Sequence, residues 1–446
     1  MSASGPIDFQ LKRYLVHMVI AVGVLAALLS ALRLWLGNSN SLTQVLWAED
    51  GVFPLCIHKA DFFTCLTDPF AGYLLFMPRM LAGIVSLFPF SSWALVTNLL
   101  AALFAGIVSA LAYWILRRAQ MTQVVSIIGG LIPVVVPIVG YEAIQALGSV
   151  YMPMLYLSVL VVIFGRFLNR WFVASLLLVT ALTIPTTIVV VPIILIWLLR
   201  RSIAPMTGIL WLAFVGIGLV AQWFTAAGAE KPRVVELGPD GLSIWADSVL
   251  PAFMTNIPGF GASSGDPSVF PAISQWSLGV VVVLALIALS GILLWRGWNF
   301  DGQANLASIA MLILAGLALS AVPAIFDGPG NRYFVVPVML WTLAVLIALN
   351  PLLTRSGVWG NALVVVILAV LWVPMFPAGA FRSTPAPAWS DEVARVSASC
   401  TADPALSERI IFTPFWPPNW GDALSEPTHP NVSCLILYPM VNSNSN

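Results

Sequence analysis

Residues 14–36 read YLVHMVIAVGVLAALLSALRLWL, and this apolar run decides the fold class. A helix needs about 20 consecutive, mostly apolar residues to cross a bilayer. In this run only His17 and Arg33 are basic, and no residue is acidic. The whole chain shares the bias, because 60% of its residues are hydrophobic and only 9% are charged. Soluble domains carry about 25% charged residues, so we predict an all-α integral membrane protein.

Similar apolar segments follow along the chain, and we count about eleven candidate transmembrane helices. Their approximate bounds are 14–36, 92–116, 122–139, 152–167, 171–184, 186–199, 207–225, 276–295, 305–326, 333–350 and 359–376. The segments 171–184 and 186–199 are short and meet at Pro185, so they are either two short helices or one broken helix. The odd number of spans depends on counting them as two.

The basic residues predict the orientation. Lysine and arginine concentrate in the short cytoplasmic loops of membrane proteins, and the shortest turns of this chain hold pairs such as Arg117-Arg118 and Arg200-Arg201. We therefore expect a cytoplasmic N-terminus and, after eleven spans, an extracytoplasmic C-terminus. Only Asp8 and Asp301 then fall on the cytoplasmic side, and all other acids fall outside.

The predicted organisation is a polytopic transmembrane domain, residues 1–376, followed by a small extracytoplasmic tail, residues 377–446. Two long outer loops cover about 37–91 and 226–275. The first loop ends in an apolar stretch that contains Arg79, which we interpret as an interfacial helix with its arginine at headgroup level. The second loop is rich in Gly, Pro and Ser, and its middle, 242–253, reads as a short amphipathic helix.

All four cysteines fall on the predicted outer side, where disulfides persist. Cys56 and Cys65 lie in the first loop, and Cys400 and Cys434 lie in the tail. The simplest pairing is Cys56 with Cys65 and Cys400 with Cys434, although four cysteines allow three connectivities. The alternative is that the thiols are free and buried.

The acidic pair Glu49-Asp50 is the principal candidate for chemistry. It follows the first span closely and is flanked by Trp47 and Phe53. A carboxylate near the bilayer boundary loses solvation, which raises its pKa and suits a general base for a hydroxyl acceptor. Successive helical residues point about 100° apart, so only one of the two would face a given cavity. The alternative is a solvated loop charge.

A second group of residues consists of candidates for substrate binding. Arg332 lies in a tight outer turn between Asn331 and Tyr333, where it either binds a phosphate bidentately or snorkels at a helix end. Arg79 either serves the same phosphate or anchors its interfacial helix. Glu142 lies in a short outer turn and either lines the same cavity or is solvated. Tyr73, in the first outer loop, completes the set of candidates.

Cofactor signals are weak in this sequence. There is no G-x-x-x-x-G-K-[ST] motif for ATP, and no His/Cys/Asp spacing that resembles a zinc site. The sequence thus requires no cofactor or metal. A divalent cation bridging a phosphate and Glu49 or Asp50 is chemically allowed.

The order of these motifs resembles the GT-C superfamily of polytopic membrane glycosyltransferases. The resemblance rests on an acidic pair followed by an aromatic residue (Glu49-Asp50-x-x-Phe53), on Pro78-Arg79 before the second span, and on Arg332-Tyr333 to Pro337 opening a late span. It covers about 330 residues in topology but few motif residues. Many members carry a large soluble C-terminal domain, whereas this chain has a short tail.

The resemblance implies transfer of a sugar, with inversion, from a polyprenyl-phosphate carrier to an extracytoplasmic glycan or lipid-glycan acceptor. Glu49 or Asp50 would be the base, and Arg332 would stabilise the leaving phosphate. The compact chain is similar to bacterial enzymes that decorate surface polysaccharides in the cytoplasmic (inner) membrane, and we expect no nucleic-acid partner. The competing hypothesis is a transporter or flippase of a lipid-linked sugar, which would favour internal repeats and charges within its spans.

Overall fold

The structure is a computed structural model that describes most of the chain. The described residues are 6–37, 41–46, 50–70, 72–140, 146–228, 245–246, 248–249, 252, 276–299, 304–327, 331–376, 388–402, 407–409 and 431–433. The sequence-based candidates Glu49, Glu142 and Cys434 lie outside them, as do the side chains of Asn331 and Arg332. The predicted helix at 242–253 is described only at 245–246, 248–249 and 252, which are helical.

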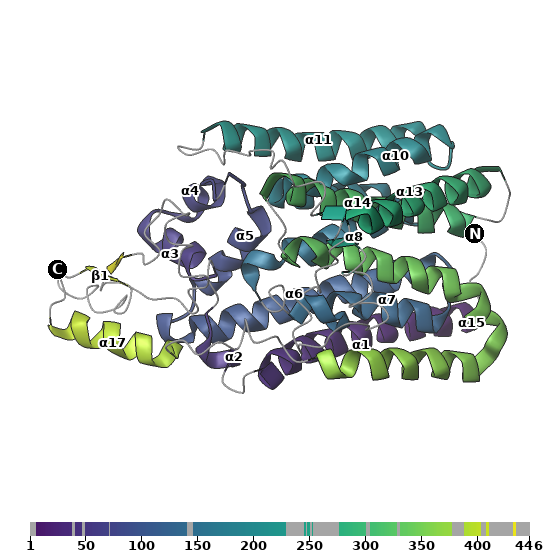
Figure 1. The fold of residues 1–446 in the computed structure, drawn as a ribbon. Helices are drawn as coiled ribbons and strands as arrows, with labels where there is room; N and C mark the ends of the chain where they lie inside the picture. The colour runs from purple at the N-terminus through teal and green to yellow at the C-terminus, as the bar shows by residue number, and fades with distance from the viewer. Residues whose placement is uncertain are drawn as a thin grey trace.

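Helices dominate the described chain (Figure 1). The α-helices are α1 (Pro6–Gly37), α2 (Ser41–Gln44), α3 (Val52–Lys59), α4 (Phe62–Thr67), α5 (Phe76–Val85), α6 (Trp93–Arg118), α7 (Gln123–Val135), α8 (Tyr151–Ile163), α9 (Arg170–Thr183), α10 (Val190–Leu199), α11 (Pro205–Gly228), α13 (Trp276–Asn299), α14 (Ala304–Asp327), α15 (Val335–Trp372) and α17 (Trp389–Ala402). The 3-10 helices are η2 (Phe90–Ser92), η3 (Pro137–Gly140), η4 (Leu147–Ser149), η5 (Gly165–Phe167), η6 (Pro185–Val189), η7 (Asn331–Phe334) and η8 (Val373–Met375). Two short antiparallel strands, β1 (Ser407–Arg409) and β2 (Asn431–Ser433), pair in the tail.

Membrane-length apolar helices are present, which confirms the prediction of an all-α membrane protein. Within the described residues, five helical stretches are long and apolar enough to cross a bilayer. They are Arg13–Gly37, Phe90–Arg118, Gln123–Gly140, Pro205–Ala227 and Val335–Met375. Shorter apolar helices lie between them, and one of these, α8, is covered by its neighbours along almost its whole length.

The segments 171–184 and 186–199 are two short helices, α9 and α10, which run in opposite directions. Trp211 Nε1, near the start of α11, donates to Arg170 O at the start of α9 (3.1 Å). Trp197 Nε1, near the end of α10, donates to Val162 O at the end of α8 (3.0 Å). The start of α9 and the end of α10 therefore lie at the same end of the bundle. The chain reverses at Ile184, whose extended backbone precedes Pro185.

The segments 333–350 and 359–376 are joined in one element, α15, that doubles back on itself. Gly357 has φ 63° and ψ −150° and interrupts the helical backbone there. This combination is essentially restricted to glycine. Figure 1 shows the two arms of α15 meeting at a sharp reversal at the right-hand edge.

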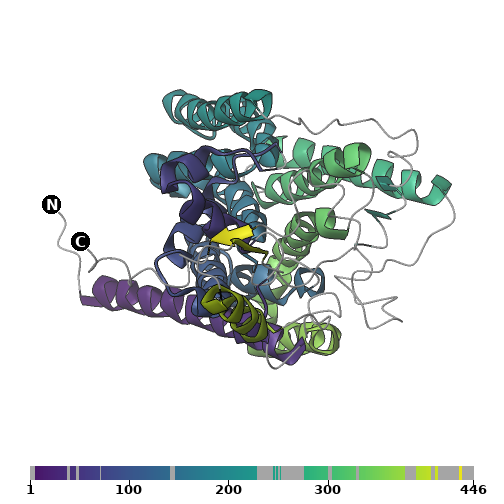
Figure 2. The same cartoon turned by 90° about the vertical axis from the view of Figure 1, so that its left-hand side faces the viewer.

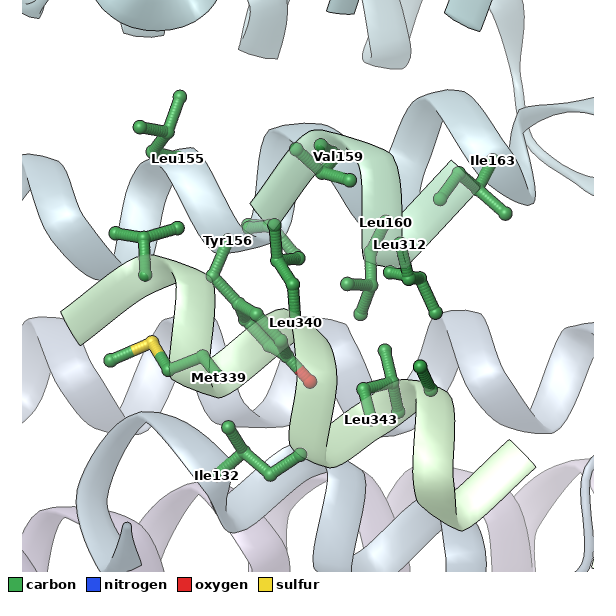
Figure 3. Packing of buried hydrophobic residues seen from close by; sticks show 14 of the residues in the cluster. Ile132, Leu155, Tyr156, Val159, Leu160, Ile163, Leu312, Met339, Leu340 and Leu343 are labelled. Atoms are coloured by element: carbon green, nitrogen blue, oxygen red, sulfur yellow. The ribbon is translucent and has the colours of Figure 1, made fainter. Parts of the chain in front are cut away.

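The core is built by close helix packing. A Cβ on Gly106 of α6 would lie 2.6 Å from the carbonyl oxygen of Gly23 in α1, so only glycine allows these two helices to approach so closely. Figure 3 shows the centre of the core, where Tyr156 of α8 inserts between α7 and α15. Its hydroxyl donates to Gly129 O at 2.7 Å, which satisfies a polar group that is otherwise surrounded by aliphatic side chains.

The two ends of the bundle differ. We call the end that carries α3, α4, α5, α17 and the β1–β2 pair the loop-bearing end, which faces the viewer in Figure 2. At the opposite end, called the arginine end, the helices are joined by short turns that contain Arg117, Arg118, Arg166, Arg170, Arg200 and Arg201. The tail helix α17 packs on the loop-bearing end, where Trp389 Nε1 donates to Phe90 O (3.2 Å).

Candidate functional site

Asp50 is a fully buried carboxylate at the loop-bearing end. It lies two residues before the start of α3, and its side chain is 0% exposed. Its Oδ1 accepts a hydrogen bond of 2.7 Å from the backbone N–H of Gly148 in η4, directly before α8. A backbone donor at this position stabilises the ionised form of the carboxylate. Asp50 therefore ties the first loop to the connection between α7 and α8.

The α7–α8 connection is irregular backbone inside an otherwise helical bundle. The regular helix α7 ends at Val135 and the chain continues through η3, and η4 leads into α8. Non-helical backbone at membrane depth is tolerated only where it is buried in protein or lines an aqueous cavity. In transporters, such breaks mark binding sites. This connection is the most distinctive backbone feature near Asp50.

Arg33 holds the first half of this connection. Its guanidinium is 0% exposed and donates to the carbonyls of Val134, Val136 and Pro137 at 2.5, 2.9 and 2.5 Å. These carbonyls lie at the C-terminal end of α7, where a cation is favourable and backbone acceptors lack helical partners. A Cβ on Gly140 would lie 2.5 Å from Arg33 Nη2, so the chain can wrap the arginine only with glycine there.

Sequence reasoning did not select Arg33 as a functional or structural candidate. The signal was available, because an arginine inside an apolar helical run is expensive and is normally buried against protein groups. Its partners could not be read from the sequence, since they lie 101 to 104 residues away.

The turn that contains Arg332 lies against the same connection. Asn331–Phe334 form η7, which contacts η3. Tyr333 is half-buried, and Phe334 is fully buried in the core. The backbone therefore brings the Asn331–Tyr333 candidates to the η3 side of the α7–α8 connection, while Asp50 holds the η4 side. Glu142 belongs to the segment between η3 and η4, outside the described residues.

Arg79 is turned into the first loop rather than toward lipid headgroups. It is 3% exposed, its Nη1 donates to Cys65 O, and its Nη2 lies 3.6 Å from Asp68 Oδ2. Its guanidinium also covers the Phe53 ring at 5.4 Å from the centroid. These contacts agree with the second alternative, in which Arg79 anchors its helix. They tie the helix to the rest of the first loop and not to the membrane interface.

Tyr73 lies in a small aromatic cluster beside the start of α8. The cluster includes Phe53, Phe70 and Tyr151. Phe53 and Phe70 meet edge to face at 5.2 Å, and Tyr73 and Phe70 exchange backbone hydrogen bonds of 2.9 Å. Tyr73 is half-buried. The cluster lies between the first outer loop and the start of α8, to which Tyr151 belongs.

A strained residue, Leu75, precedes α5, and no sequence motif predicts it. Leu75 has φ 46° and ψ 47°, a left-handed conformation that non-glycine residues seldom adopt. The backbone N–H of Leu74 donates to Gln222 Oε1 (3.0 Å), and that of Met77 donates to Thr183 Oγ1 (3.2 Å). The ends of α9 and α11 thus hold the first loop on both sides of Leu75.

The prediction that the cysteines form disulfides is confirmed for the three cysteines that the structure describes. Cys56 and Cys65 form a disulfide that links α3 to α4, with their Cα atoms 5.8 Å apart. Cys400 in α17 is buried and is also disulfide-bonded. Its predicted partner, Cys434, lies outside the described residues. No described cysteine is free.

Two cavities are prominent in the described structure, and neither is lined by Asp50 or Arg79. One, of about 20 Å³, lies beside the α7–α8 connection and is lined by Ser30, Val139, Ala146 and Val150, among others. This is room for about one water molecule. The other is an apolar cleft in α15. The described residues contain no group of three or more His, Cys, Asp or Glu side chains arranged to hold a metal ion.

Comparisons with models of protein families and with curated proteins find no match to this chain. The assignment of function therefore depends on the residues and their geometry.

Proposed function

We propose that this protein is a membrane glycosyltransferase of the GT-C type, which transfers a sugar from a polyprenyl-phosphate carrier to an extracytoplasmic glycan or lipid-glycan acceptor. The supporting observation is the buried carboxylate of Asp50, bound to Gly148 N–H at the edge of an apolar helix bundle. A general base must be held ionised and oriented near the reacting hydroxyl. Few other described acids are so enclosed, and Glu392, which is also buried, is engaged by Arg395 within α17.

The proposed topology has eleven spans, with α15 contributing two arms and α9 and α10 counted separately. The arginine end then faces the cytoplasm of a bacterial cell, and the loop-bearing end faces outward. This orientation puts the Cys56–Cys65 disulfide in an oxidising compartment. It also gives the candidate site access to a lipid-linked donor in the outer leaflet.

In the proposed reaction, Asp50 or Glu49 removes the proton from an acceptor hydroxyl as its oxygen attacks the anomeric carbon. The bond from that carbon to the phosphate oxygen breaks, the configuration inverts, and polyprenyl phosphate leaves. Arg332 compensates the phosphate charge, with Asn331 and Tyr333 beside it and Glu142 near the acceptor. No cofactor is required, and a divalent cation would have phosphate oxygens and Glu49 or Asp50 as ligands.

The test is transfer of radiolabelled sugar by membranes that contain Asp50→Asn or Glu49→Gln. Asparagine retains an oxygen that can accept from Gly148 N–H, so Asp50→Asn removes the charge and keeps the contact. We expect the variant that lacks the base to lose about 100-fold or more of the rate. The matched control is Asp61→Asn, because Asp61 is an exposed acid in the same loop that caps α4 through Thr64, and asparagine caps equally well.

Two results would reject the proposal. One is normal transfer by both single variants and by the double variant. The other is movement of labelled lipid-linked sugar across vesicles that lack any acceptor, which is the result expected of the competing transporter.

A further inference from the structure

Four arginines lie in the two turns that join α8 to α9 and α10 to α11 at the arginine end. They are Arg166, Arg170, Arg200 and Arg201, and we call them the arginine cluster. No Asp or Glu occurs between residues 143 and 229. The two turns and the helices that they join therefore contribute no carboxylate to balance the four positive charges.

Two tryptophan hydrogen bonds hold these turns side by side. Trp197 Nε1, near the end of α10, donates to Val162 O at the end of α8 (3.0 Å). Trp211 Nε1, in α11, donates to Arg170 O at the start of α9 (3.1 Å). A Cβ on Gly165 would lie 2.4 Å from the Trp211 ring, so the α8–α9 turn packs directly on α11. The arginines of the two turns are therefore neighbours in the folded protein.

Arg166 and Arg200 are close enough to repel each other. The Arg200 guanidinium lies over the Trp197 ring at 5.6 Å from its centroid, and that of Arg166 lies over the Phe167 ring at 4.6 Å. Burial lowers the pKa of Arg200 below its ordinary value, and the charge of Arg166 lowers it further. Two like charges brought together from separate turns are unfavourable. An anion in contact with both guanidinium groups would relieve that repulsion.

Two members of the arginine cluster depart from the usual composition of helix ends. Arg170 is the first residue of α9, where the helix dipole disfavours a cation. Arg201 follows α10 with φ 53°, and its N–H donates to Leu198 O (3.0 Å). The N–H of Ser202 donates to Trp197 O (3.0 Å), which completes a Schellman motif. Glycine is the usual residue at this left-handed position. Such departures are expected at functional sites, so both positions indicate a need for positive charge.

The surroundings of the arginine cluster identify the source of the anion. Trp171, next to Arg170, is 53% exposed, and tryptophan is enriched where helices reach the lipid headgroups. Leu199 and Met206, which flank the α10–α11 turn, are 74% and 69% exposed. Apolar side chains so exposed in a membrane protein face acyl chains. The anion at this depth is therefore the phosphate of a lipid headgroup, whose oxygens a guanidinium binds bidentately.

We propose that the arginine cluster binds the phosphate of an anionic phospholipid, which Arg166 and Arg200 contact from the two turns. Arg170 and Arg201 lie to either side and add positive charge around the headgroup. Basic pockets between transmembrane helices are known to bind such headgroups. The site lies at the opposite end of the bundle from Asp50, so it does not depend on the proposed sugar transfer.

The experiment measures lipid retained by the full-length protein in mild detergent, by native mass spectrometry, after exchange with an equimolar mixture of two lipids. Dioleoyl phosphatidylglycerol and dioleoyl phosphatidylcholine have the same chains, and only the first has a net negative charge. We expect wild type to retain phosphatidylglycerol over phosphatidylcholine by about tenfold, as two cationic contacts allow. The double variant Arg166→Gln/Arg200→Gln should reduce that preference to about twofold.

The matched control is Arg13→Gln/Arg355→Gln, which removes the same two charges from exposed positions of the arginine end. Figure 1 shows the reversal of α15, near Arg355, well away from α10 and α11. This control should keep the tenfold preference. An equal loss in both double variants would overturn the proposal, because the preference would then belong to the total charge of this end and not to a site.

Arg201→Gly separates binding from folding. Glycine suits the left-handed backbone at this position, so the variant should be at least as stable as wild type and still lose about half of the preference. Equal retention of the two lipids by wild type would overturn the proposal. So would an unchanged preference in Arg166→Gln/Arg200→Gln and in Arg201→Gly. Release of phosphatidylglycerol by about 1 mM inorganic pyrophosphate would assign the cluster to a soluble phosphate and would also overturn it.

Discussion

The loop-bearing end and the arginine end are both rich in polar side chains, but they use them differently. At the arginine end, guanidinium groups lie over aromatic rings that are one to four residues away, as in Arg118 over Trp114 and Arg166 over Phe167. At the loop-bearing end, polar side chains bind backbone groups that are far away in sequence, such as Arg33 with Val134 O and Gln222 with Leu74 N. The arginines of one end therefore pack locally, although other polar groups there do join distant segments, as Thr122 N–H does by donating to Asn350 Oδ1 (2.9 Å). At the other end, buried arginine and glutamine side chains make the long-range contacts.

The difference follows from where the helices stop. At the loop-bearing end, α7 and α9 end among buried residues, so their last carbonyls cannot reach water. Arg33 caps α7, and Gln222 Nε2 donates to Ala181 O and Leu182 O (3.2 and 2.7 Å) at the end of α9. At the arginine end, the helices reach the surface and their arginines are exposed or half-buried. Buried caps therefore hold the described backbone around the candidate site.

The largest effect is expected from Arg33→Met, which replaces the buried cap of α7 by an apolar chain of similar length. Three carbonyls lose their donor, and relief from burying the charge offsets part of the loss. We expect destabilisation of about 3 kcal/mol, read as a lower unfolding midpoint in mixed micelles. The matched variant at the other end is Arg118→Met, which loses only a surface cation–π contact and should change stability by less than about 1 kcal/mol. Equal effects would remove the distinction between the two ends.

Gln222→Leu is expected to have the next largest effect. It leaves Leu74 N–H, Ala181 O and Leu182 O without their side-chain partner, which costs about 2–3 kcal/mol. Because Leu74 N–H then loses its fixed position, the strained turn at Leu75 should also open to protease before global unfolding. The control at the arginine end is Gln123→Leu, whose exposed amide makes one long hydrogen bond to Tyr14 (3.4 Å). A Gln222→Leu protein as stable and as protease-resistant as wild type would show that the cap is unimportant.

These caps also mark the limit of what the sequence predicts. The apolar segments, the arginine-rich turns and the Cys56–Cys65 disulfide are local or compositional signals, and the structure contains them as predicted. The break between α9 and α10 was signalled by Pro185, but whether it made one helix or two depends on packing against α8 and α11. Contacts such as Gln222 with Leu74 span 148 residues, and no period or motif encodes them.

The candidate site shows the same division. The acidic pair was conspicuous in the sequence, and Asp50 is buried. Its contact with Gly148 was not predictable, because it depends on how α8 is placed by the rest of the bundle. For Arg79, the sequence predicts the role of an anchor but not the groups that it anchors to. Its position in an apolar stretch suggested a headgroup contact, whereas Asp68 and Cys65 provide a nearer partner within the loop.

Gly357→Ala tests one of the positions where the arginine end depends on an unusual backbone, as it also does at Gln120 (φ 61°) and Arg201 (φ 53°). Its φ of 63° and ψ of −150° disfavour any Cβ, although nothing lies within 4 Å of where that Cβ would be. The cost is therefore conformational, about 1–3 kcal/mol. The control is Gly291→Ala, also with open space around the Cβ but in the middle of helix α13, which should be neutral or slightly stabilising. If Gly357→Ala matched Gly291→Ala in unfolding midpoint, the reversal in α15 would not need glycine.

His58 should give the smallest effect, a pH dependence confined to the loop-bearing end. Burial lowers the pKa of His58 below its ordinary 6.5, and a hydrogen bond with the backbone of Ser86 opposes part of that shift. Its ring stacks on Trp93 with centroids 5.5 Å apart. The folded state favours the neutral ring, so this contribution to stability is complete above pH 6.5 and is lost as the pH falls toward the folded pKa.

We expect the thermal unfolding midpoint to fall on the order of 1 °C more between pH 7.5 and 5.5 in wild type than in His58→Gln. Asp61 does not interfere, because its hydrogen bonds with Thr64 keep its pKa below 3.8. Identical pH profiles for the two proteins would show that the Trp93 contact is indifferent to the charge of the ring.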